Sequence, residues 1–186
     1  SHKKVEEKAT SSLIKEFKEG IKTVVEAPWL WISILLFALS NITLAGPYSV
    51  SLPFLVSDHL GAEVGTLSLL YALFAIGYVI GGLWVGQQDT IRHRGLMMYG
   101  GLAVAGLMLA LFGLPIGIVG LAIAALINGA ALEVGNLAWI SSLQERIPTH
   151  KLGRVSSVDT VGSIALLPIG LGLTGWATEL VGAPLI

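Results

Sequence analysis

The sequence contains no cysteine, and only 12% of its 186 residues are charged. A soluble domain of average composition carries about 25% charged residues, so this chain lacks the polar groups that would cover a water-exposed globule. The absence of cysteine excludes both a disulfide scaffold and a thiolate metal site. The net charge of −1 gives no electrostatic footprint for nucleic acid. These absences leave few soluble classes of protein open.

Signatures of catalysis are missing as well. The histidines His59, His93 and His150 do not have the spacing of metal ligands. No Ser/His/Asp constellation is present, and no glycine-rich phosphate loop follows a strand, because no alternating strand pattern occurs. We therefore predict that the protein is not an enzyme and that it uses no metal and no cofactor.

Long apolar runs are what the sequence has in abundance. A bilayer core about 30 Å thick is crossed by roughly 20 apolar residues in a helix. Five segments meet this requirement, at residues 28–56, 65–86, 96–114, 116–143 and 155–181. The sequence predicts an all-α polytopic membrane protein embedded in a lipid bilayer. Because the start of another hydrophobic segment follows residue 181, we expect five of six spans, with the sixth missing or cut.

The basic residues are sorted along the chain. All 11 Lys and Arg residues fall within residues 3–22, 92–94 and 146–154, which lie on one side of a five-span weave. The opposite loops hold Asp58, Glu63 and Glu179 and no basic residue. Lys and Arg gather in cytoplasmic loops of membrane proteins, so we predict that the N-terminus is cytoplasmic.

Residues 1–27 differ in kind from the rest of the chain. Apolar residues recur there at steps of three and four between Lys and Glu, which predicts a cytoplasmic amphipathic helix that rests on the bundle or the membrane surface. For the residues before Ser11, a partly disordered linker is the alternative. Pro28 marks the end of this helix. The apolar set is Leu13, Ile14, Phe17, Ile21, Val24 and Val25.

Small residues and prolines mark contacts and bends within the spans. Gly77-x-x-x-Gly81 has the spacing that lets a neighbouring helix backbone approach closely. Pro47 and Pro168 lie inside spans and predict bends. Asn41 precedes the first bend, and it either faces a wet interior or makes a hydrogen bond between helices.

Glu133 lies near the middle of the fourth span, where an unpaired ionised carboxylate costs on the order of 3 kcal/mol. At about 100° per residue, Asn128, Asn136 and Glu133 fall within an arc of about 140°. Clustering on one face indicates a polar cavity wall that handles substrate or protons. A structural hydrogen bond to a neighbouring helix is the alternative.

Asp159 is predicted near the cytoplasmic start of the fifth span, where Lys151 or Arg154 would cap it. Asp159 either relays protons or is a first-turn charge at the membrane interface. Its position near the start of the span favours a first-turn charge.

Three stretches carry a family resemblance. "FKEGIKTVVEAPWLW" (Phe17–Trp31), "GLWVGQQDTIRHRG" (Gly82–Gly95) and "LQERIPTHKLGRV" (Leu143–Val155) resemble the C-terminal half of a major facilitator superfamily transporter. They are similar in particular to the bacterial efflux branch of enterobactin exporters and macrolide-efflux proteins. Asp89 matches the aspartate of the family's cytoplasmic motif, and His93 and Arg94 match its basic pair. Thr90 and Arg92 depart from that motif.

The resemblance implies one half of a transporter that works by alternating access, completed by an N-terminal six-helix half or by a second copy. It implies proton-coupled efflux of small amphiphilic molecules across a bacterial inner membrane. Opposite charges between cytoplasmic loops could latch the inner gate, and a solvated basic rim is the alternative. A membrane interaction module that transports nothing is the rival function. The predicted gate and motif residues are Asp89, Arg92, Arg94, Glu145, Arg146, Gly153 and Arg154.

Overall fold

The computed structural model describes residues 16–88 and 90–185, and all regular structure in these ranges is helical. A helix at residues 16–26 is followed by α2 (Pro28–Gly46), α3 (Leu52–Phe54), α4 (Val64–Gly86), α5 (Arg94–Ala110), α6 (Gly117–Arg146), α7 (Thr149–Ala165) and α8 (Leu167–Val181). π-Helical turns occupy η1 (Pro47–Ser51) and η2 (Leu55–His59), and 3₁₀ turns occupy η3 (Leu111–Gly113) and η4 (Ala183–Leu185). The all-α prediction is confirmed.

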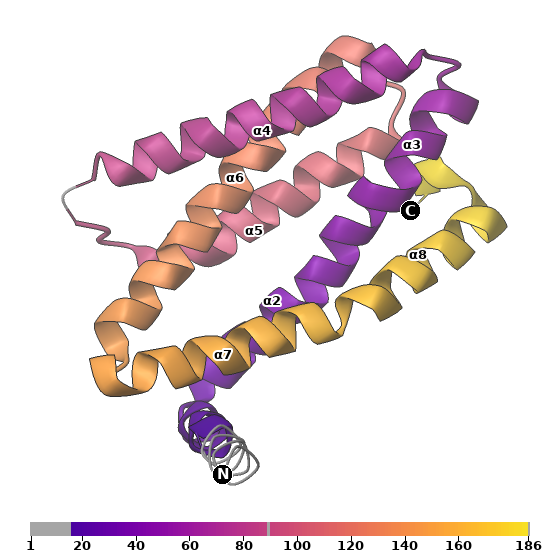
Figure 1. The fold of residues 1–186 in the computed structure, drawn as a ribbon. Helices are drawn as coiled ribbons and strands as arrows, with labels where there is room; N and C mark the ends of the chain where they lie inside the picture. Colours follow the sequence, from indigo (N-terminus) through magenta and orange to yellow (C-terminus); the bar gives the residue numbers. More distant parts are fainter. Residues whose placement is uncertain (1–15, 89, 186) are drawn as a thin grey trace, which may run out of the picture.

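Five helical stretches of the described chain are long and apolar enough to cross a membrane. They are Pro28–Asp58, Val64–Gly86, Arg94–Gly113, Gly117–Arg146 and Thr149–Val181. The first combines α2 with the π turns and α3, and the fifth combines α7 with α8 (Figure 1). The fifth helix begins at Thr149 rather than at residue 155, because the polar residues before the apolar run are already helical.

Helix α6 packs on α4 and α5 with backbone against backbone. A methyl group added to Gly77 of α4 would collide with the Leu126 backbone, and one added to Gly129 of α6 would collide with the Phe74 backbone. On the α5 side, a Cβ on Gly101 would lie 2.5 Å from the Ala131 carbonyl oxygen. Gly77 thus allows the close approach that its spacing predicts, and Gly101 and Gly129 provide two further close contacts.

Helix α2 packs against α7 and α8 instead (Figure 1). Gly46 lies against Thr174, and a Cβ on Gly170 would come within 2.8 Å of the Ile42 side chain. The buried hydroxyl groups of Ser51 and Thr178 share a hydrogen bond of 2.8 Å. The predicted bend at Pro47 is a π-helical turn, and Pro168 begins α8 after the break at Leu166.

The helix at residues 16–26 lies on the start of α7. Val24 is 5% exposed and belongs to a buried cluster with Val155 and Leu143. A Cβ on Gly20 would lie 2.7 Å from the carbonyl oxygen of Arg154. The first fifteen residues of the predicted amphipathic segment lie outside the described residues. The helix ends at Glu26, and the non-helical Ala27 separates it from Pro28, as the proline predicts.

Buried side chains form two clusters, one toward each end of the bundle. One includes Leu30, Trp139 and Val155, near the helix at residues 16–26. The other includes Leu52 and Leu121, near the opposite ends of the spans. The connection between α4 and α5 and the turn between α6 and α7 lie at the same end as the helix at residues 16–26 (Figure 1). The basic residues of the described chain are concentrated at that end.

Candidate functional site: a cavity between two helix groups

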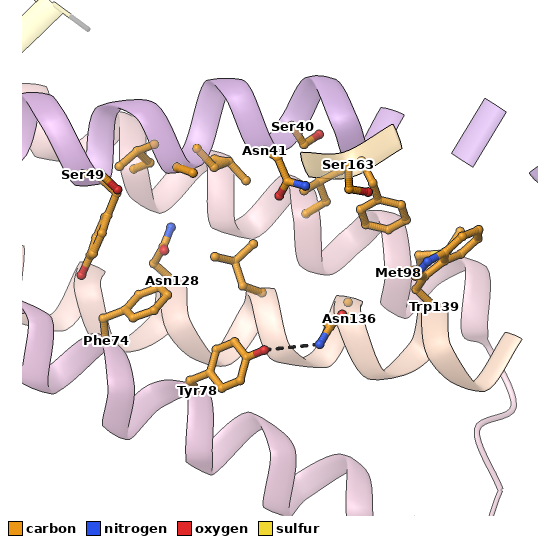
Figure 2. Close-up of a pocket in the computed structure, with 18 of the residues that line it drawn as sticks. Ser40, Asn41, Ser49, Phe74, Tyr78, Met98, Asn128, Asn136, Trp139 and Ser163 are labelled. Atoms are coloured by element: carbon orange, nitrogen blue, oxygen red, sulfur yellow. Dashed lines mark hydrogen bonds between the residues drawn. The ribbon is translucent and has the colours of Figure 1, made fainter. Parts of the chain in front are cut away.

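A cavity of about 540 Å³ lies between α2 and α7 on one side and α4, α5 and α6 on the other. This volume is in the range of sites for small molecules. Figure 2 shows polar side chains from several helices around it. The polar lining residues are Ser40, Asn41, Ser49, Asn128, Asn136, Asp159, Thr160 and Ser163, and the aromatic ones are Phe37, Tyr48, Phe74, Tyr78 and Trp139.

Helix α6 supplies five residues of the wall, and they recur at helical spacing on one face of the helix. They are Asn128, Leu132, Gly135, Asn136 and Trp139. Residues three and four apart lie on the same face of an α-helix. Two of the three polar residues of the predicted face, Asn128 and Asn136, therefore border a cavity, and their role in handling substrate or protons stays a prediction.

Asn41 of α2 lines the cavity, which agrees with the prediction that it faces the interior of the bundle. Ser40 lies beside it (Figure 2). Asn128 is a lining residue and at the same time joins two helices. Its amide Nδ2 donates a 2.6 Å hydrogen bond to the carbonyl oxygen of Ala105 in α5, and the residue is only 2% exposed. Both of these asparagines are thus placed where the predicted polar cavity lies.

Glu133 is not one of the residues that line this cavity. It lies on the α4 side of α6, where a Cβ on Gly82 would be 3.6 Å from its carboxylate Oε1. Asn136 links it to the cavity, because Asn136 Nδ2 donates to Glu133 Oε2 at 3.2 Å and to the Tyr78 hydroxyl at 3.3 Å. Figure 2 shows the Tyr78–Asn136 contact. Glu133 is therefore one residue removed from the cavity.

Asp159 is a lining residue, and its predicted first-turn position is wrong. Helix α7 begins at Thr149, so Asp159 lies about 15 Å along the axis at 1.5 Å per residue. Its Oδ2 accepts a 3.0 Å hydrogen bond from the indole Nε1 of Trp139. The expected cap by Arg154 is also wrong, because Arg154 forms its ion pair with Glu19.

The predicted gate residues form separate contacts at one end of the bundle. Arg94 at the start of α5 forms an ion pair with Glu145 near the end of α6. The guanidinium of Arg146 lies 5.2 Å from the ring centroid of Trp29. Arg154 Nη1 donates to Glu19 Oε2 at 2.5 Å. These pairs are within one helical bundle, so their role in a gate stays a prediction.

The other three members of the predicted gate set are Asp89, Arg92 and Gly153. Asp89 lies outside the described residues. Arg92 is exposed, and Gly153 is exposed with open space beside its Cα. Within residues 16–88 and 90–185, no group of three or more His, Asp or Glu side chains could hold a metal ion.

Sequence reasoning missed the aromatic part of the wall. Tyr48 packs between Phe74 and Phe112, with ring centroids 4.8 and 6.2 Å away. Phe74 and Tyr78 are four residues apart on α4, and that spacing is a signal that was available. Trp139 is 6% exposed, and it packs between Trp29 and Phe37.

These helices define a polytopic helical membrane protein with a cavity between two groups of its helices. The sequence model of the Major Facilitator Superfamily matches residues 1–178. The chain belongs to this superfamily, and the predicted resemblance is confirmed.

Two groups of curated relatives are similar to the chain. Macrolide efflux protein A of Streptococcus pyogenes is 26% identical over 175 residues, which are 92% of this chain and 42% of the relative. The enterobactin exporter EntS of Escherichia coli O1:K1 is 29% identical over 163 residues, 87% of this chain and 38% of the relative. The chain thus spans about two fifths of the length of these relatives. No solved structure matches the chain.

Proposed function

We propose that this chain is one half of a secondary-active transporter that exports small amphiphilic molecules by alternating access. The observation that carries the proposal is the cavity of about 540 Å³, whose wall combines amide, hydroxyl and carboxylate groups with aromatic rings. Polar groups within a largely apolar pocket are what a site for an amphiphilic molecule requires. Membership of the superfamily and the printed names of two efflux relatives support the same function.

The other half of the pathway comes from a second six-helix bundle or a second copy of this chain. Transporters of this architecture bind substrate at the interface between two repeats near the middle of the membrane. The basic end of the bundle faces the cytoplasm of a bacterial inner membrane, by the positive-inside rule. The Arg94–Glu145 and Arg154–Glu19 pairs at that end stabilise one state of the inner gate.

Proton coupling is assigned to two carboxylates within the membrane-spanning helices. Asp159 borders the cavity directly, and Glu133 communicates with it through Asn136. A carboxylate at membrane depth that meets a hydrated cavity takes up a proton from one side and releases it to the other. Each could therefore link proton movement to efflux.

The rival function, an interaction module, has less support. The glycine faces that would serve association between chains are used inside this chain, where Gly77 and Gly129 hold α4 against α6.

The test is transport by the complete protein that contains this chain, reconstituted in vesicles. A pH gradient is imposed, and uptake of a macrolide antibiotic, enterobactin and the dye Hoechst 33342 is measured. We expect at least one probe to be taken up about tenfold faster than by protein-free vesicles, and the rate to fall when the gradient is collapsed. Folded protein that moves none of the three probes in either direction would contradict the proposal.

Two variants examine the coupling. Glu133→Gln and Asp159→Asn should each abolish uptake driven by the pH gradient while expression stays intact. Glu179→Gln, on a carboxylate at the opposite end of the bundle, is the matched control and should leave uptake unchanged. Unaltered gradient-driven uptake in both variants would remove these two residues from the mechanism.

A further inference from the structure

The cavity contains an acidic side chain. Asp159 is the one charged side chain among the described residues that line it. Trp139 donates its indole N–H to Oδ2, while Oδ1 accepts no hydrogen bond from the residues that the structure describes. Oδ1 is not among the buried unpartnered atoms of the described residues, so it is accessible from the cavity and a bound molecule can reach it.

Among the residues that the structure describes, no cationic side chain borders the cavity to pair with Asp159. Arg94 and Arg154 lie at the end of the bundle and are paired with Glu145 and Glu19. A positive charge on a bound molecule would therefore meet attraction from Asp159 and no repulsion from a basic group. A bound anion would be repelled by Asp159 and attracted by no basic group. Because solvent and salt screen charges only weakly in a partly buried site, the attraction of a cation and the repulsion of an anion are both stronger there than at the surface.

Aromatic rings line the space near this carboxylate. Trp139, which holds Asp159, packs against Phe37 with centroids 5.4 Å apart, and both rings border the cavity. Tyr48, Phe74 and Tyr78 border it from η1 and α4. Aromatic faces attract organic cations through the ring quadrupole and supply apolar contact area. The wall thus offers both parts that a lipophilic cation needs.

We propose that the cavity binds a monovalent organic cation with an apolar or aromatic body, such as a substituted ammonium or phosphonium. Asp159 Oδ1 is its counter-ion, and Trp139 is the positioning residue that orients the carboxylate. The proposal rests on the proposed function, because it names the class of substrate that the same cavity would carry. A volume of about 540 Å³ admits a molecule of drug size.

The test compares two ions of the same shape and opposite charge. Equilibrium dialysis measures the binding of tetraphenylphosphonium and of tetraphenylborate to the purified complete protein in detergent. We expect saturable binding of tetraphenylphosphonium and at least tenfold weaker binding of tetraphenylborate. Replacing sodium chloride by potassium chloride at the same ionic strength should leave tetraphenylphosphonium binding unchanged, because the site selects an organic cation rather than a particular inorganic one.

Three variants assign the charge to Asp159. Asp159→Asn should weaken tetraphenylphosphonium binding at least tenfold and reduce the preference for this ion over tetraphenylborate. Asp159→Glu keeps the negative charge, so it should retain part of the affinity for tetraphenylphosphonium and part of the preference. Glu179→Gln should leave both unchanged. Because Asp159→Asn keeps the volume and an oxygen for Trp139, its thermal unfolding midpoint should stay near that of the parent protein.

Trp139→Phe gives a readout of positioning. It should weaken tetraphenylphosphonium binding only severalfold while the preference over tetraphenylborate persists, because the charge is still present. Equal binding of the two ions, or full tetraphenylphosphonium affinity in Asp159→Asn, would overturn the inference.

The result separates this inference from the proposed function. Gradient-driven uptake of enterobactin by a protein that does not bind tetraphenylphosphonium would refute the cation site and support transport. Saturable tetraphenylphosphonium binding that depends on Asp159, in a protein that transports none of the probes, would support the cation site and contradict the proposed transport.

Discussion

The two helix groups that border the cavity are held together in different ways. Helices α4, α5 and α6 meet at glycines, with backbone against backbone, as at Gly77, Gly101 and Gly129. Helix α2 meets α7 and α8 mainly through side chains, such as Ile42 against Gly170 and the hydroxyl pair of Ser51 and Thr178.

The helices that meet at glycines are also the more regular ones. Helices α4 and α6 run for 23 and 30 residues without interruption. The first span contains two π-helical turns, and the fifth breaks at Leu166. Interrupted helices with side-chain contacts repack more easily than helices in direct backbone contact. We therefore infer that α4, α5 and α6 form the rigid wall of the cavity and that α2 with α7 and α8 forms the adjustable wall.

The largest effect is expected where the rigid wall is broken. Gly77→Ile places a branched side chain against the Leu126 backbone, which cannot retreat. We expect a loss of about 3 kcal/mol or more in the free energy of unfolding, measured by denaturant unfolding in mixed micelles. Gly86→Ile, at a glycine of the same helix with open space beside it, is the matched control. Equal destabilisation by both variants would refute the rigid contact.

An intermediate effect is expected in the adjustable wall. Ser51→Ala removes one partner of the buried bond to Thr178, but Thr178 keeps its hydrogen bond to the Thr174 carbonyl oxygen. The loss should be about 1 kcal/mol, and the Ser51→Ala/Thr178→Val double variant should lose less than the sum of the single variants. Strict additivity would show that the two hydroxyl groups do not interact. If Ser51→Ala lowered the free energy of unfolding as much as Gly77→Ile, the two walls would not differ in rigidity.

The smallest effect is expected at the ion pair between the helix at residues 16–26 and α7. The Arg154 and Glu19 side chains are 35% and 46% exposed, so solvent screens them and the coupling energy should be below about 1 kcal/mol. A double-mutant cycle with Arg154→Gln and Glu19→Gln measures it. The coupling should shrink further in 1 M salt. A coupling that is large and independent of salt would mean that this contact is as firm as the glycine contacts.

The five spans could be predicted because hydropathy records the apolar surface that a membrane helix needs. The start of the fifth span could not be predicted in the same way. Residues 149–154 are polar and still helical, since a helix continues beyond the apolar run into the polar interface. That error misplaced Asp159, whose depth depends on where α7 begins.

For the polar face of α6, the sequence predicts the angles between the side chains around the helix axis but not which neighbouring helix each side chain meets. On a helix of 3.6 residues per turn, Asn136 lies about 80° and Glu133 about 140° from Asn128. Asn128 reaches α5 at one edge of this arc, Asn136 lines the cavity, and Glu133 reaches the α4 side at the other edge. Periodicity gives such angles but not the directions of the neighbouring helices. The aromatic wall depends on those neighbours, which is why Tyr48 and Trp139 were not predicted to line a site.

The π-helical turn at Pro47–Ser51 holds one residue more than an α-helical turn of the same height. Deleting a single residue there would convert it into regular α-helix and rotate everything beyond it by about 100° relative to α2. Ser51 would swing away from Thr178, and Leu52 and Val56 would leave the buried cluster that they now share with Leu121. The extra residue thus sets the rotational phase between the two halves of the first span, and so decides which side chains each half turns inward.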